Sequence, residues 1–159
     1  MGGSGSGIVR FDNATELDQA VLDDAIDLGI DGTGLVQKVI ESADGLIHRV
    51  EMLGTGFFYG TEQALQADAF NYCAADGCSV GEDAIQLFTP PSEIVEQAAA
   101  VMIGASTDVG GVEYIIDAST GEPTFYDFNP YSNFLAGQDD GLGFNPIDRY
   151  LDFVHNQAR

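Results

Sequence analysis

Residues 110–129, GGVEYIIDASTGEPTFYDFN, decide the fold. Two runs in which apolar and polar residues alternate flank a turn-forming segment at residues 119–121, a pattern typical of a β-hairpin. Antiparallel pairing about this turn places Glu113 opposite Asp127. Asp127 shares a strand face with Asn129, because successive side chains of a strand point to opposite faces. The opposite face is then expected to carry the apolar side chains Val112, Tyr114, Ile116, Tyr126 and Phe128.

Glu113, Asp127 and Asn129 form a candidate metal site. Two carboxylates directly opposite each other on paired strands repel unless a cation lies between them. Two carboxylates and an amide oxygen are hard ligands of the kind that suits Mg²⁺. A strand with one solvated face would produce the same alternation without any metal. From spacing alone, both interpretations stay open.

Outward from this hairpin, strands alternate with helices. The apolar patterns predict strands at residues 8–11, 35–40, 46–53, 56–61, 110–117 and 123–129, and helices at 16–27, 93–105 and 147–157. The first helix is expected to bury a stripe of Leu17, Ala20, Val21 and Ala25. This order predicts an α+β fold with helices packed on a mainly antiparallel sheet.

The charge balance excludes several classes of partner. The chain has 159 residues, of which 26 are acidic and 5 are basic, giving a net charge of −21. Such a surface disfavours binding to nucleic acids or to anionic membranes, and it favours cations or a basic partner. No apolar run approaches the roughly 20 residues of a membrane span, and the N-terminus lacks the pattern of a signal peptide. A cytoplasmic protein is expected.

Two smaller features are ambiguous by composition. Residues 2–7, GGSGSG, match a flexible linker, but they also match a glycine-rich turn whose N–H groups could bind phosphate. Cys73 and Cys78 are too few for a disulfide scaffold, and we interpret them as free thiols.

Four segments together resemble the ATP-grasp ligases, in particular the ligases similar to the ribosomal-protein glutamate ligase. The segments are GGSGSGIVRF (2–11), DGTGLVQKVI (31–40), GLIHRVEML (45–53) and GGVEYIIDASTGEPTFYDFNPYSNF (110–134). The last is the most specific, because the family's metal ligands come from an acid on one strand and a D/E-x-N motif on the next. The resemblance covers nearly the whole chain and implies an ATP-grasp fold that binds ATP and Mg²⁺ or Mn²⁺.

Residue by residue, the resemblance implies the following roles. Glu113, Asp127 and Asn129 would be the metal ligands, and Ser132 and Asn133 would follow them near the acceptor. Arg49 would be a catalytic residue, because it matches an arginine of ligases that modify acidic peptides. The nucleotide would be held by a phosphate loop of Gly3, Ser4, Gly5, Ser6 and Gly7, an adenine segment of Gln37, Lys38 and Val39, and Glu41 or Asp44 at the ribose.

The resemblance also implies a domain division and a function. Residues 1–40 would be a remnant of the first ATP-grasp lobe, and residues 41–159 the C-terminal lobe. The family's earlier domain and its strand with a phosphate-binding lysine are not matched, so we expect an N-terminally truncated form with impaired catalysis. The implied function is an ATP-dependent carboxylate–amine or carboxylate–thiol ligase that acts through an acyl phosphate on small substrates. The alternatives are a non-catalytic or engineered nucleotide- or metal-binding module, and a structural fragment that self-associates as a homodimer.

Overall fold

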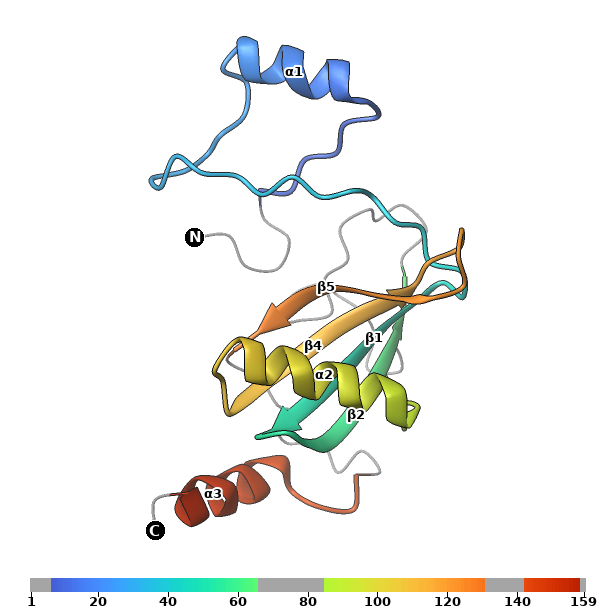
Figure 1. Cartoon of the computed structure of the whole chain (residues 1–159), viewed down its shortest axis with the longest axis vertical. Helices are drawn as coiled ribbons and strands as arrows, with labels where there is room; N and C mark the ends of the chain where they lie inside the picture. Colours follow the sequence, from blue (N-terminus) through green and yellow to red (C-terminus); the bar gives the residue numbers. More distant parts are fainter. Residues whose placement is uncertain (1–6, 66–84, 131–141, 158–159) are drawn as a thin grey trace. The chain divides into compact units, whose positions relative to one another are not determined.

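The computed structural model describes residues 7–65, 85–130 and 142–157, which divide into two compact units (Figure 1). Residues 7–39 belong to the first unit, and the described residues from Ile40 onward form the second. None of the helices within these ranges combines the length and apolarity that crossing a membrane requires.

The second unit is built on a five-stranded antiparallel sheet of strand order β3-β2-β1-β4-β5. Its strands are β1 (Leu46–Leu53), β2 (Gly56–Ala64), β3 (Ile85–Phe88), β4 (Val109–Ile116) and β5 (Pro123–Asn129). Two helices, α2 (Ser92–Gly104) and α3 (Pro146–Gln157), belong to the same unit. The predicted α+β class and antiparallel sheet are confirmed. The short edge strand β3 was not predicted from the sequence.

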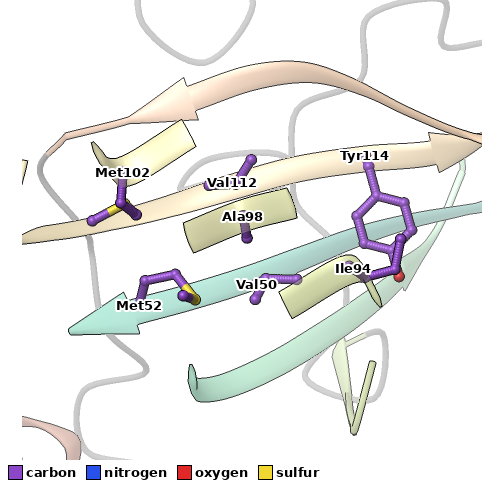
Figure 2. Close-up of a cluster of buried hydrophobic side chains, with 7 residues drawn as sticks. All are labelled: Val50, Met52, Ile94, Ala98, Met102, Val112 and Tyr114. Atoms are coloured by element: carbon purple, nitrogen blue, oxygen red, sulfur yellow. The ribbon is translucent and has the colours of Figure 1, made fainter. Parts of the chain in front are cut away.

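Helix α2 covers one face of the sheet and forms the hydrophobic core with it (Figures 1 and 2). Pro90 and Pro91 precede the helix, and its buried side chains recur on one face. The core consists of Ile94, Ala98 and Met102 from α2 with Val50, Met52, Val112 and Tyr114 from β1 and β4. Since residues alternate along a strand, the neighbours of Val50 on β1 point to the opposite face.

The core environment of Tyr114 predicts alkaline destabilisation. Burial, together with the charges of Asp44 and Glu62, raises the pKa of Tyr114 to about 12. A raised pKa stabilises the fold fully below the ordinary value of about 10, and that stabilisation is lost as the pH rises through the folded value. Two pKa units correspond to a loss of about 3 kcal/mol in the free energy of unfolding.

Urea unfolding as a function of pH tests this expectation. The Tyr114→Phe variant has no hydroxyl to ionise and should lose less stability than the wild type between pH values of about 10 and about 12. The pKa of Tyr126 is also raised, so part of the alkaline loss should persist in the variant. Identical pH profiles for the two proteins would contradict the prediction.

The first unit differs from the sequence-based prediction. In the described residues of this unit there is one helix, α1 (Ala14–Leu22), whose N-cap is Asn13: the Asn13 side chain accepts from the Glu16 N–H at 3.0 Å. However, α1 ends at Leu22, and none of its residues is buried, so the predicted buried stripe is wrong. Within the described residues of the unit, α1 meets no partner for that stripe, and Val21 remains 62% exposed.

The strands predicted at residues 8–11 and 35–40 are also wrong. Neither segment pairs with a strand, and Leu35 and Val36 are 82% and 73% exposed. An apolar run is a strand only where a partner takes up its N–H and C=O groups. That pairing begins just afterwards, where Ser42 forms an isolated bridge to Asp117 beside the β4–β5 turn.

Candidate functional site

The face of the sheet opposite α2 carries a row of polar residues from adjacent strands. In the register of the sheet, Arg49 of β1 lies between Thr61 of β2 and Glu113 of β4, and Glu113 in turn pairs with Asp127 of β5. The predicted pairing of Glu113 with Asp127 is therefore confirmed. The next row places Glu51 opposite Gly111, and Gly111 opposite Asn129.

Arg49 lies between two buried carboxylates. Its Nε donates to Glu51 Oε1 at 2.6 Å, and its Nη1 donates to Glu113 Oε1 at 2.6 Å. The side chains of Glu51 and Glu113 are only 2% and 3% exposed. Burial by itself would lower the pKa of Arg49, but the two carboxylates outweigh it and raise the pKa. Arg49 thus supplies a cation between the buried carboxylates of Glu51 and Glu113, and its guanidinium is held inside the protein.

Gly111 makes room for the guanidinium. A Cβ atom at this position would lie 2.6 Å from Arg49 Cζ and 2.7 Å from Arg49 Nε, closer than a real Cβ contact. The arginine therefore lies directly over the backbone of β4, in a space that any larger residue would fill. Gly111, the second glycine of the pair at 110–111, thus has a packing role in addition to its place in the strand.

A β-bulge in β5 changes one predicted side-chain position. The register shifts between Glu113 and Tyr114, so Glu113 pairs with Asp127 whereas Tyr114 pairs with Phe125. Tyr126 is the extra residue, and its hydroxyl donates to Glu113 Oε2 at 3.0 Å. The prediction that Tyr126 covers the apolar face is wrong. Phe125 packs against the core instead, because the bulge breaks the alternation on which the prediction depended.

The environment of Glu113 combines desolvation with opposing charges. Burial raises the pKa of its carboxyl group, and the nearby charge of Asp127 raises it further. Arg49 and the Tyr126 hydroxyl act in the opposite direction, but the net pKa is raised. Each oxygen of Glu113 already accepts one hydrogen bond, from Arg49 on Oε1 and from Tyr126 on Oε2. A carboxylate oxygen has capacity for a second ligand, so the group can still meet a cation.

Asp127 and Asn129 form the exposed side of the site. Asn129 Nδ2 donates to Asp127 Oδ2 at 2.9 Å, and the Phe128 N–H donates to Asp127 Oδ1 at 3.0 Å. Asp127 is exposed and Asn129 is half-buried. The three predicted metal ligands, Glu113, Asp127 and Asn129, therefore occupy adjacent strands around one paired position.

The net charge of the residues around the candidate site balances that of one divalent cation. Glu51, Glu113 and Asp127 carry three formal negative charges, and Arg49 carries one positive charge, which leaves two negative charges in excess. One divalent cation would neutralise this excess. In the part of the chain that the structure describes, no three His, Cys, Asp or Glu side chains are grouped as a metal site. The candidate site relies instead on two carboxylates and an amide oxygen.

The predicted nucleotide-binding residues are divided between the two units, and several of them lie outside the described residues. Gly7 and the segment Gln37, Lys38 and Val39 are exposed residues of the first unit. In the second unit, the Asp44 carboxylate accepts from Ser42 Oγ at 2.8 Å and from the Leu46 N–H at 3.0 Å. The Glu41 carbonyl accepts from the Ala118 N–H at 2.8 Å. The remaining predicted residues, Gly3, Ser4, Gly5, Ser6, Cys73, Cys78, Ser132 and Asn133, lie outside the described residues.

Sequence reasoning missed three residues of the site: Glu51, Gly111 and Tyr126. Glu51 was detectable, because it lies two residues from Arg49 and therefore shares its strand face. Tyr126 was not detectable, since nothing in the alternating pattern reveals the bulge. Gly111 could be recognised only once the guanidinium was seen above it.

Comparisons with known proteins found similar structures but no similar sequence or family. A scan against models of protein families found no match, and a search of curated proteins found no similar sequence. Among solved structures, the ATP-grasp ligase PsnB complexed with a minimal precursor is similar at a TM-score of 0.56 and 11% identity, over 77% of this chain and 37% of PsnB. The macrocyclase MdnC from Microcystis aeruginosa MRC, bound with the precursor peptide MdnA, is similar at a TM-score of 0.51 and 18% sequence identity. The likeness covers 76% of this chain and 35% of MdnC.

The chain thus spans a little over a third of the length of these two proteins. At such low identity, the likeness concerns the fold and not the activity. Within that limit, the resemblance drawn from the sequence is confirmed: this chain has the fold of part of an ATP-grasp ligase.

Proposed function

We propose that the protein is the ATP- and Mg²⁺-binding part of an ATP-grasp ligase that joins a carboxylate to an amine or a thiol. The observation that carries the proposal is the polar row on the sheet, where Glu113 and Asp127 face each other with two negative charges in excess around Arg49. The shared fold with ATP-grasp ligases supports it independently.

In this proposal, Glu113, Asp127 and Asn129 hold the metal ion, and Mn²⁺ can replace Mg²⁺. Residues 3–7 cover the phosphates, residues 37–39 contact the adenine, and Glu41 or Asp44 contacts the ribose. ATP bound there would transfer its γ-phosphoryl group to the substrate carboxylate and leave as ADP, and the amine or thiol would then displace phosphate from the acyl phosphate. Arg49 and Tyr126 keep the Glu113 carboxylate in one orientation, since each donates to one of its oxygens.

The substrates we propose are small carboxylates and amines, or peptides that carry these groups. PsnB was solved with a minimal precursor and MdnC with a precursor peptide, which supports testing peptide carboxylates first. Trapping of the acyl phosphate with hydroxylamine, over a panel of amino-acid and peptide carboxylates, would identify the acid. Nucleotide binding without any trapped product would favour a non-catalytic binding module instead. The homodimer stays a prediction, which light scattering would test.

The Asp127→Asn variant tests the metal site. Its affinity for Mg²⁺ should fall by at least about tenfold, because the cation loses a charged ligand. The stability of the metal-free protein should hold or rise, since the substitution removes repulsion with Glu113. Isothermal titration with Mg²⁺ alone and with Mg²⁺-ATP measures the first effect, and thermal melts measure the second.

The matched control is Asp152→Asn on α3, which removes the same charge from an exposed position. It should change neither the Mg²⁺ affinity nor the melting temperature measurably. A large loss of stability in metal-free Asp127→Asn would mark Asp127 as a structural hydrogen-bonding group. An unchanged Mg²⁺ affinity in Asp127→Asn would contradict the proposal that this site binds the metal ion.

A further inference from the structure

Glu51 is the one charged member of the site that the proposed function leaves without a role. It is 2% exposed, as deeply buried as Glu113, and its Oε1 accepts from Arg49 Nε at 2.6 Å. It stands in the second polar row, opposite Gly111, and not in the row of Glu113 and Asp127. Burial of a second carboxylate is costly, so its presence calls for a physical reason.

We propose that Glu51 is a positioning residue of the cation site: it offsets the charge of Arg49 and thereby leaves the charge of Glu113 available to a divalent cation. This inference rests on the proposed function, because it concerns the same cation.

The charge of Glu51 sets the net charge of the cluster around Arg49. If Glu51 were neutral, Arg49 and Glu113 would form one neutral pair, and Asp127 alone would attract the cation. The formal excess would fall from two negative charges to one. Cation affinity increases with the number of charged ligands in the site, and the interior of a protein screens such differences weakly. Glu51 therefore acts on the cation through Arg49 and not by contact.

The geometry adds an orientational effect. The Nε contact to Glu51 and the Nη1 contact to Glu113 fix the guanidinium at two points, above the space left by Gly111. The fixed guanidinium in turn holds Oε1 of Glu113, while Tyr126 holds Oε2. Partners behind a metal ligand commonly tune its affinity in this way.

The test is a titration with Mn²⁺ alone, followed by electron paramagnetic resonance, on the whole chain. Glu51→Gln keeps the size of the side chain and an oxygen that accepts from Arg49, and it should weaken Mn²⁺ binding by about ten- to a hundredfold. Glu51→Asp keeps the charge and should stay within about threefold of the wild type. Glu96→Gln, which removes the same charge from the exposed surface of α2, should bind Mn²⁺ like the wild type.

Melting temperatures of the metal-free proteins separate positioning from a structural role. The proposal expects Glu51→Gln to melt close to the wild type while losing Mn²⁺ affinity. Wild-type affinity in Glu51→Gln would overturn it, and so would a Glu51→Gln chain that no longer folds, because Glu51 would then be a structural residue. If Asp127→Asn loses Mn²⁺ affinity and Glu51→Gln does not, only this inference fails. If the wild type itself binds no Mn²⁺, the proposed function fails with it.

Discussion

Replacing Arg49 with methionine should lower the free energy of unfolding of the sheet unit by about 3–5 kcal/mol, because it leaves buried carboxylates without their cation. Glu51 and Glu113 each rely on the guanidinium through a 2.6 Å contact, and both are almost fully buried. Methionine fills much of the space of the arginine stem, so the loss reports the charge and not a cavity. Urea unfolding followed by the circular dichroism of the sheet measures it.

Arg149→Met is the matched control for this prediction. Arg149 belongs to the same unit and is exposed, and its guanidinium lies 5.4 Å from the centre of the Phe144 ring. Removal of the same charge there should cost at most about 1 kcal/mol, the usual contribution of an exposed cation–π contact. If Arg49→Met cost no more than Arg149→Met, the buried carboxylates would have to be stabilised by groups other than Arg49.

The Gly111→Ala substitution should also destabilise the sheet unit strongly, by about 3 kcal/mol. The new methyl group would lie 2.6 Å from Arg49 Cζ, and the guanidinium cannot move aside without breaking its contacts to Glu51 and Glu113. The end of an arginine is normally flexible and yields at little cost. Here the two carboxylates hold the guanidinium in place, so the arginine cannot yield and the clash with the added methyl group becomes costly.

A double-mutant cycle identifies the cause. In an Arg49→Met background the clash is relieved, so Gly111→Ala should cost clearly less than in the wild type. Gly104→Ala, at the end of α2 where nothing lies within 4 Å of the added Cβ, is the control and should be neutral or slightly stabilising. If the losses in unfolding free energy for Gly111→Ala and Arg49→Met were strictly additive, the cost of the alanine would come from strain in the strand and not from a clash with Arg49.

Local patterns predicted the elements that carry the site. The alternation in residues 110–129 was sufficient to predict the hairpin and to pair Glu113 with Asp127, and the helix predicted at residues 93–105 matches α2 at Ser92–Gly104 closely. These predictions succeeded because strand alternation, turn residues and helix starts depend on neighbours close in sequence.

The bulge and the ion-pair cluster could not be predicted in this way. Tyr126 belongs to the apolar face by simple alternation, but one extra residue in β5 brings its hydroxyl to Glu113. The resemblance implied a catalytic role for Arg49, but it gave no sign that the sheet would place this side chain between two buried carboxylates. Both outcomes depend on how neighbouring strands pair, across 13 residues of sequence for Tyr126 and Glu113 and across 64 for Arg49 and Glu113.

The sequence by itself determined the acidic charge, the hairpin with its opposed carboxylates, and the bounds of α2 and α3 to within one residue. Only the tertiary structure decided whether an apolar run became a strand, as at residues 46–53, or remained exposed, as at 8–11 and 35–40. It also decided which carboxylates share Arg49. The physical reason is the same in both cases: hydrogen-bond partners and opposite charges come from distant strands, and a buried polar group is stable only where such a partner reaches it.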